Sequence, residues 1–82
     1  MKAAFVLVKC EQGRVAEVAK AIIEIDGVSE FHSVTGDHDL LVKLYAESYD
    51  AFGDLIPTQI QRVAGIRETS TMLAFRAFTG GS

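Results

Sequence analysis

Two short runs of the chain, residues 3–8 (AAFVLV) and 40–45 (LLVKLY), are apolar at nearly every position instead of every second one. Successive side chains of a β-strand point to opposite faces, so a strand with this pattern must be covered on both faces. We therefore expect both runs in the middle of a sheet. The chain has only 82 residues to cover them, and 49% of its residues are hydrophobic.

Two further segments, residues 14–25 and 48–64, carry apolar residues at helical spacing and are predicted to be helices. The second contains Pro57, which removes a backbone hydrogen bond and clashes with the carbonyl four residues earlier. We expect a kink there, or two short helices joined at Pro57. The apolar stripes are Val15, Val18, Ala19, Ile22 and Ile23 in the first helix, and Phe52, Leu55, Ile56, Ile60 and Val63 in the second.

Residues 28–35 and 66–75 are predicted to be the remaining strands, the former at an edge because it is more polar. Simple alternation places Val28, Glu30 and His32 on one side of that strand and Phe31 on the other. The order is β-α-β-β-α-β, and each helix ends on an apolar-x-Gly sequence before a strand begins. This order is typical of the ferredoxin-like α+β fold, an antiparallel four-stranded sheet with two helices on one face. Residues 1–78 are expected to form one domain, and residues 79–82 a flexible tail.

Two helices on one face of a sheet leave the other face uncovered, although both middle strands carry apolar side chains there. Each large apolar side chain left in water forgoes about 1.5–3 kcal/mol. Packing against an identical sheet would bury these side chains. We therefore expect a sheet-to-sheet homodimer, the arrangement called a dimeric α/β barrel, and further assembly of dimers into tetramers or octamers.

Composition disfavours several classes of function. The net charge is −3 and the eight lysines and arginines are scattered, so no direct contact with nucleic acid is expected. Cys10 is the single cysteine, which excludes an intramolecular disulfide and any CxxC motif and fits a reducing cytoplasm. No apolar run approaches the roughly 18 residues of a membrane span, and the N-terminal run is too short for a signal peptide. We expect a cytoplasmic protein with no membrane partner.

Polar residues concentrate between the two strands predicted at 28–35 and 40–45, in the segment Thr35-Gly36-Asp37-His38-Asp39. We predict that this corner is half of a small-molecule site. The carboxylate of Asp37 or Asp39 would pair with a ligand's ammonium group, and backbone amides would bind its carboxylate. The alternative is a polar turn, in which glycine supplies the dihedral angles and aspartate bonds its own backbone. A metal site is disfavoured because three ligands in one corner rarely converge on one ion, and no cofactor is predicted.

The last predicted strand offers the hydroxyl groups of Thr69, Ser70 and Thr71. They are candidates for the other half of the site, provided that they approach the corner of another subunit. The alternative is the ordinary preference of threonine for strands.

No catalytic residue is predicted. His32 and His38 could serve as general bases, but no serine or cysteine lies in a recognisable nucleophile motif. Asp37 and Asp39 lie too close together in one turn to bracket a scissile bond. Solvated histidines and an inert Cys10 are the expected outcome.

Two segments carry a resemblance to a known family. They are Val28-x-x-Phe31-x-x-Val34-Thr35-Gly36-Asp37-His38-Asp39-Leu40-Leu41-Val42 and Gly65-Ile66-Arg67-Glu68-Thr69-Ser70-Thr71. Both resemble the effector-binding domain of the Lrp/AsnC (feast/famine) transcription regulators, also called the RAM domain. The Thr-Gly-x-x-Asp corner and the Gly-Ile-x-x-Thr-x-Thr strand are the most specific parts.

The resemblance implies a ferredoxin-like domain that dimerises sheet to sheet and often assembles four dimers into a ring. It also implies an amino acid bound between dimers, by the positions Gly36 to Asp39 and, from another subunit, Thr69 and Thr71. His38 departs from the aromatic residue, usually tyrosine, that is common at its position.

Family regulators carry an N-terminal helix-turn-helix domain, whereas Met1 here lies at the start of the first strand, so we expect a stand-alone RAM protein. The predicted function is a non-enzymatic module that binds a free amino acid at a subunit interface and modulates its own assembly or full-length Lrp/AsnC regulators. One alternative is a small dimeric α/β-barrel enzyme of the monooxygenase or isomerase kind, with a buried pocket containing His32. Another is a purely structural oligomerisation domain.

Overall fold

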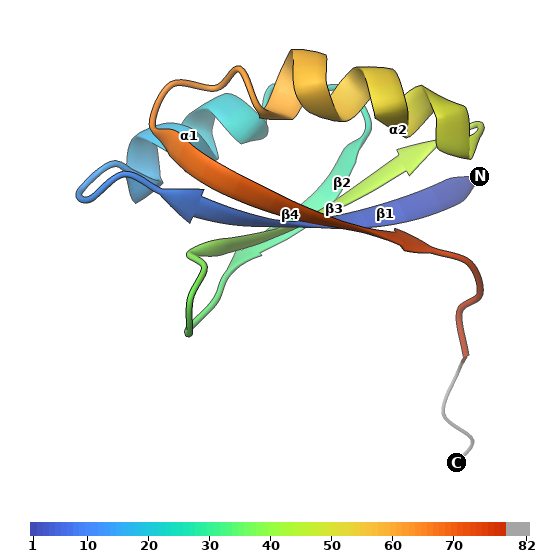
Figure 1. Cartoon of the computed structure of the whole chain (residues 1–82), viewed down its shortest axis with the longest axis horizontal. Coiled ribbons are helices and arrows are strands. Elements are labelled where there is room, and N and C mark those ends of the chain that lie inside the picture. The colour runs from blue at the N-terminus through green and yellow to red at the C-terminus, as the bar shows by residue number, and fades with distance from the viewer. Residues whose placement is uncertain (79–82) are drawn as a thin grey trace.

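The computed structural model describes residues 1–78, which form a single antiparallel sheet with helices over one of its faces (Figure 1). The strands lie in the order β2-β3-β1-β4, so β1 and β3 are central, as predicted. This arrangement confirms the ferredoxin-like fold; the predicted tail at residues 79–82 lies outside the described residues. The elements are β1 (Lys2–Cys10), α1 (Val15–Ile22), β2 (Val28–Ser33), β3 (Leu40–Ala46), α2 (Tyr49–Leu55), the π-helical segment η1 (Ile56–Ile60) and β4 (Ile66–Ala74).

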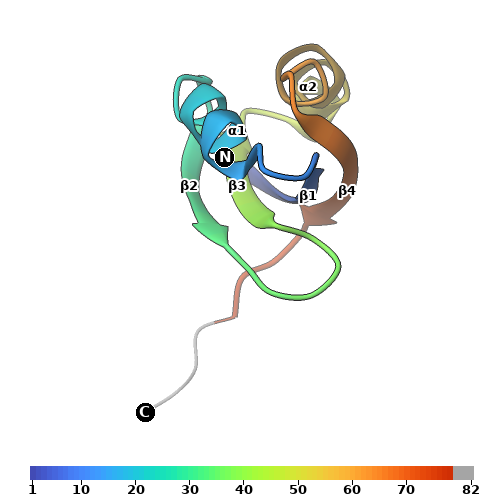
Figure 2. The same ribbon diagram turned by 90° about the vertical axis from the view of Figure 1, so that its left-hand side faces the viewer.

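Side chains of the central strands alternate between a covered face and an open face of the sheet. Both helices lie over the covered face, as the rotated view in Figure 2 shows. On the other side, Leu7 lies opposite Leu41 and Phe5 opposite Lys43, so a second apolar layer crosses both central strands. The prediction that these strands are apolar on both faces is confirmed. We call this side the open face; it comprises Ala3, Phe5, Leu7, Leu41, Lys43, Tyr45, Ser70 and Met72.

The space between the sheet and the helices is filled by apolar side chains. Phe52 and Ile60 of the second helix and Val18 and Ile22 of α1 are all at most 2% exposed. Within residues 1–78, no polar or charged residue is buried. The buried residues that come from the strands are Ala4, Val6, Val8, Cys10, Leu40, Val42 and Leu44.

The second helix changes type at Ile56, the residue before Pro57, and continues as η1 (Figure 1). Ser48 caps its start, where the Ser48 hydroxyl accepts a hydrogen bond of 3.3 Å from the Ala51 N–H. After Leu55 the helix widens, and the Ile56 carbonyl accepts from the Gln61 N–H, five residues on, at 2.9 Å. Because proline has no N–H to donate, a wider turn accommodates it without ending the helix. The predicted break is therefore a junction of two short helical segments.

Two predictions of local structure are wrong in detail. Strict alternation fails in β2, because a register shift between Val28 and Glu30 turns both Val28 and Phe31 toward the covered face, opposite Leu44 and Val42. Apolar residues three apart then share a face of one strand. The first helix ends at Ile22 instead of residue 25, and Ile23 beyond it is 66% exposed.

Gly65 offers a stability test, because it has a φ of +96° and packs tightly before β4. A β-carbon there would lie 2.9 Å from the Val18 Cγ2 atom. Gly13 has a φ of +79° but no heavy atom within 4 Å of such a carbon. Backbone strain of this kind costs about 1–3 kcal/mol, so Gly13→Ala should show that cost alone and Gly65→Ala a larger one. Urea unfolding of the two variants measures the difference, and equal losses would show that the clash relaxes freely.

Candidate functional site

The predicted corner is the hairpin between β2 and β3, which projects from the sheet on the side away from the helices (Figure 1). Two backbone hydrogen bonds close it: the Val34 N–H donates to the Asp39 carbonyl at 3.0 Å, and the Asp39 N–H donates to the Val8 carbonyl at 2.8 Å. Gly36 at its tip has a φ of +105°, which favours glycine, and is surrounded by open space. The tip of the corner is therefore accessible to solvent, while the end of the corner at Asp39 is hydrogen-bonded to β1.

The tip presents unused donors and one unused carboxylate. Within residues 1–78, the N–H groups of residues 35–38 donate no hydrogen bond, and the Asp37 carboxylate has neither a hydrogen-bond nor a salt-bridge partner. Asp37 is exposed and His38 is half-buried. Backbone N–H groups bind anions and a carboxylate binds cations, so the tip can bind a small zwitterion.

Asp39 is engaged differently from Asp37, a difference that the sequence did not reveal. Its carboxylate accepts a hydrogen bond of 2.8 Å from the backbone N–H of Cys10, at the end of β1. Burial of the Cys10 thiol, and secondarily the negative charge of Asp39, raises the pKa of that thiol. A raised pKa leaves less thiolate to react, which makes Cys10 a poor nucleophile.

The three hydroxyl residues of β4 are divided between the faces of the sheet. Thr69 lies opposite Val8 and Thr71 opposite Val6, which places both on the covered side, whereas Ser70 lies opposite Leu7 on the open face. The Thr69 hydroxyl also accepts a hydrogen bond of 2.9 Å from Gln61 Nε2. One subunit therefore offers Thr69 and Thr71 in one direction and Ser70 in the other.

Within one chain, the corner and the threonines lie at the same end of the sheet but on either side of β1. The corner bonds to Val8 from the β3 side, and Thr69 pairs with Val8 from the β4 side. Neighbouring strands are about 4.7–4.9 Å apart, so two spacings separate these groups. A site that contains both sets of residues needs a second subunit, and that joint site stays a prediction.

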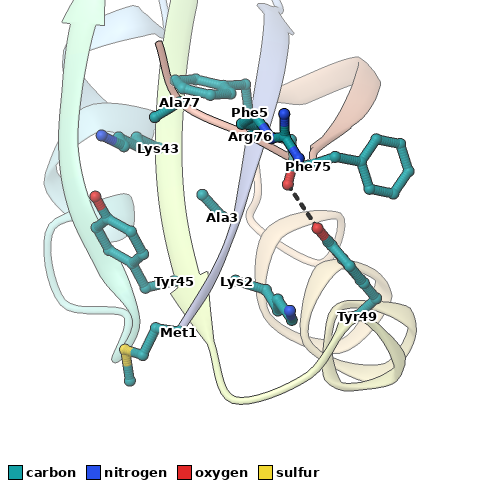
Figure 3. Close-up of a pocket in the computed structure, with 11 residues that line it drawn as sticks. Met1, Lys2, Ala3, Phe5, Lys43, Tyr45, Tyr49, Phe75, Arg76 and Ala77 are labelled. Carbon is teal, nitrogen blue, oxygen red and sulfur yellow. Dashed lines mark hydrogen bonds between the residues drawn. The ribbon is translucent and has the colours of Figure 1, made fainter. Parts of the chain in front are cut away.

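A pocket of about 340 Å³ opens on the other half of the open face, where the chain leaves β4 (Figure 3). Its cationic side chains rest on aromatic rings: Lys43 Nζ lies 5.2 Å from the centre of the Tyr45 ring and 5.7 Å from that of Phe5. A hydrogen bond with Tyr45 raises the pKa of Lys43. The Tyr49 hydroxyl donates to the Ala74 carbonyl at 2.8 Å and holds the exit of the chain from β4. Sequence reasoning missed this pocket, for which the only signal was a charge, Lys43, inside an apolar run.

The histidines do not form a catalytic pocket. His32 is exposed on the open side of the sheet, and its Nε2 lies 2.8 Å from Glu30 Oε2, a hydrogen bond that lowers the pKa of Glu30. His32 does not line the pocket of Figure 3, and the interior between the sheet and the helices is apolar. Over the same residues, no group of three or more His, Cys, Asp or Glu side chains is placed to hold a metal ion. None of the described helices has the length and apolar character to cross a membrane.

The strand order and the position of the helices define a small domain of the ferredoxin-like type with an exposed polar corner. The sequence profile of the Lrp/AsnC ligand binding domain matches residues 3–80, and the chain belongs to that family. It is 37% identical, over 72% of its length, to an uncharacterized HTH-type transcriptional regulator of Pyrococcus horikoshii. The chain spans less than half the length of this relative, covering 39% of it.

Solved structures share the fold of this chain. A crystal structure of a protein from Thermus thermophilus superimposes with a TM-score of 0.89 at 35% identity, covering 98% of this chain and 100% of that one. A transcriptional regulator of Neisseria meningitidis, solved in complex with L-Met, has the same fold with a TM-score of 0.85 at 16% identity; the match covers 96% of this chain and 53% of that one.

Some of the relatives are enzymes. Homocitrate synthase of Sulfolobus acidocaldarius is 32% identical over 89% of this chain, but the match covers only 16% of that protein. The likeness therefore concerns a small part of that enzyme.

Proposed function

We propose that this chain is a non-enzymatic regulatory module that binds a free amino acid at an interface between subunits. The observation that carries the proposal is the tip of the corner, where the backbone N–H groups of four consecutive residues, 35–38, and the carboxylate of Asp37 have no partners among the described residues. An amino acid carries one carboxylate and one ammonium group on a single carbon. Its carboxylate would accept from the backbone N–H groups, and its ammonium group would pair with Asp37. The Neisseria regulator, solved with L-Met, shares the fold and supports this class of ligand.

The proposed site is completed by a second chain. The residues of the site would be Thr35, Gly36, Asp37, His38 and Asp39 of one subunit, with Thr69 and Thr71 of another; Ser70, on the opposite face, would meet a different neighbour. A second copy packed on the open face would bury Leu7, Leu41 and Met72, the last of which is 51% exposed in the single chain. Further contacts between dimers would then bring corner and threonines together.

The proposed output is a change of assembly, in the cytoplasm, of this chain alone or with full-length Lrp/AsnC regulators. A ligand shifts an assembly equilibrium only when it binds one assembly state more tightly than the other. A site made by two subunits meets this condition, because it exists only in the assembled state.

The test is calorimetric titration of the purified chain with each of the twenty protein amino acids, followed by sedimentation with and without each binder. We expect at least one amino acid to bind and to shift the distribution of assembly states. Absence of binding across the whole set would refute the amino-acid assignment. Binding without any shift would refute the coupling to assembly.

Asp37→Asn tests the recognition of the ammonium group. A hydrogen bond to a charged group contributes about 1.5–3 kcal/mol, so we expect binding to weaken roughly ten- to hundredfold. Asp54→Asn, at an exposed position of α2 far along the chain, removes the same charge as a control and should bind normally. Equal affinity of the Asp37→Asn variant and the unmodified chain would exclude this carboxylate from the site.

A further inference from the structure

Asp39 makes three hydrogen bonds within the chain, at both of its backbone polar groups and at its side chain. Its N–H donates to the Val8 carbonyl at 2.8 Å, its carbonyl accepts from the Val34 N–H at 3.0 Å, and its carboxylate accepts from the Cys10 N–H at 2.8 Å. The first and third bonds join the corner to β1 at two points. Asp39 therefore fixes the point at which the chain leaves the corner and enters β3.

The bond to Cys10 fills a gap in the sheet. The β1–β3 pairing ends at Val8 opposite Leu40, so no residue of β3 lies opposite Cys10, and the β1–β4 register also shifts between Lys9 and Cys10. Cys10 is only 7% exposed, and a backbone N–H in such a place needs an acceptor. The Asp39 carboxylate stands where a carbonyl group of a longer β3 would have been.

We propose that Asp39 is a positioning residue and that Asp37 alone supplies the charge that binds the ligand. By holding the corner against β1, Asp39 would keep the N–H groups of residues 35–38 in the conformation in which they donate no hydrogen bond within residues 1–78. Asp37, two residues away, is exposed and has no partner within residues 1–78. The ligand part of this inference rests on the proposed function, whereas the link to Cys10 is independent of it.

The variant Asp39→Asn separates positioning of the corner from binding of the ligand by charge. The side-chain carbonyl oxygen of asparagine can still accept from the Cys10 N–H, but the side chain carries no charge. We would compare Asp39→Asn, Asp39→Ala and Asp37→Asn by titration with the twenty amino acids, one at a time. Amide hydrogen exchange of Cys10 would be followed by NMR under conditions where every variant is folded. The Val6 amide, in the middle of β1, serves as the reference for global opening.

The positioning role predicts that Asp39→Asn binds the ligand with an affinity within about threefold of that of the unmodified chain. Asp39→Ala should bind it at least about tenfold more weakly, because a loss of about 1.4 kcal/mol of binding free energy corresponds to a factor of about ten. Exchange at Cys10 relative to Val6 should accelerate in Asp39→Ala only. In Asp37→Asn, binding should weaken roughly ten- to hundredfold, and the exchange at Cys10 should be unchanged.

Two results would overturn the inference. If Asp39→Asn loses binding as completely as Asp39→Ala, the charge of Asp39 contacts the ligand. If exchange at Cys10 is unchanged in Asp39→Ala, the link to β1 has no role in holding the corner. Should no amino acid bind the unmodified chain, the proposed function fails, and the exchange measurement still decides whether Asp39 fastens the corner.

Discussion

Leu41→Asp is expected to break the proposed sheet-to-sheet dimer and to leave a monomer. Leu41 lies in the middle of the open face, opposite Leu7, and is half-buried by its own chain alone. A two-fold dimer repeats every substitution, so two leucines are lost from one interface. Full burial of a leucine contributes about 1.5–3 kcal/mol, and about half of that comes from the interface because Leu41 is already half-buried, so the two losses sum to roughly 1.5–3 kcal/mol and weaken dimerisation about ten- to hundredfold. The added carboxylates would also have to be desolvated, which increases the effect.

Sedimentation velocity over a concentration series measures this change. Ile23→Asp is the matched control, because Ile23 is 66% exposed beyond the end of α1, on the helical side of the molecule. That variant should keep the dimerisation constant of the unmodified chain. If Leu41→Asp sediments like the unmodified chain, the open face is not the dimer interface, and the proposed two-subunit site loses its basis.

Phe52→Ala is expected to produce the largest loss of folding stability. Phe52 is 2% exposed and is the largest fully buried side chain between the sheet and α2. Truncation of a buried phenylalanine costs about 3–5 kcal/mol, a large part of the stability of so small a domain. Urea unfolding monitored by circular dichroism gives the change in the free energy of unfolding.

This substitution also tests the enzyme alternative. A chain built around an internal pocket would tolerate a shorter side chain in its lining, whereas a filled core would not. Ile23→Ala, which shortens an exposed apolar side chain, should change stability by no more than about 0.5 kcal/mol. A loss below about 1 kcal/mol for Phe52→Ala would mean that the interior holds unfilled space.

The sequence was sufficient to predict the strand order and the two-sided character of β1 and β3. The reason is physical: a run such as residues 3–8, apolar at consecutive positions, is stable only where both faces are covered. Right-handed crossovers between parallel strands then predicted that both helices cover the same face of the sheet. The polar corner was predictable because Gly36 and the neighbouring Asp37 and Asp39 lie in a connection between two predicted strands.

Features that depend on pairing between distant residues were not predictable in the same way. The register shift in β2 depends on which residues of β3 lie opposite, so alternation alone misplaced Val28 relative to Phe31. Asp37 and Asp39 look equivalent in the sequence, and only the position of the Cys10 N–H, 29 residues away, distinguishes them. The pocket beside Lys43 likewise needs segments from both ends of the chain.

The alternation along β4 has an evolutionary consequence. Ser70 and Met72 lie on the open face, while Thr69 and Thr71, next to them in the chain, lie on the covered side. In the proposed assembly, neighbouring codons would therefore experience separate selection, one set for subunit pairing and the other for the identity of the small molecule. A lineage could exchange its effector by point mutation at odd-numbered positions of this strand and retain its quaternary structure throughout.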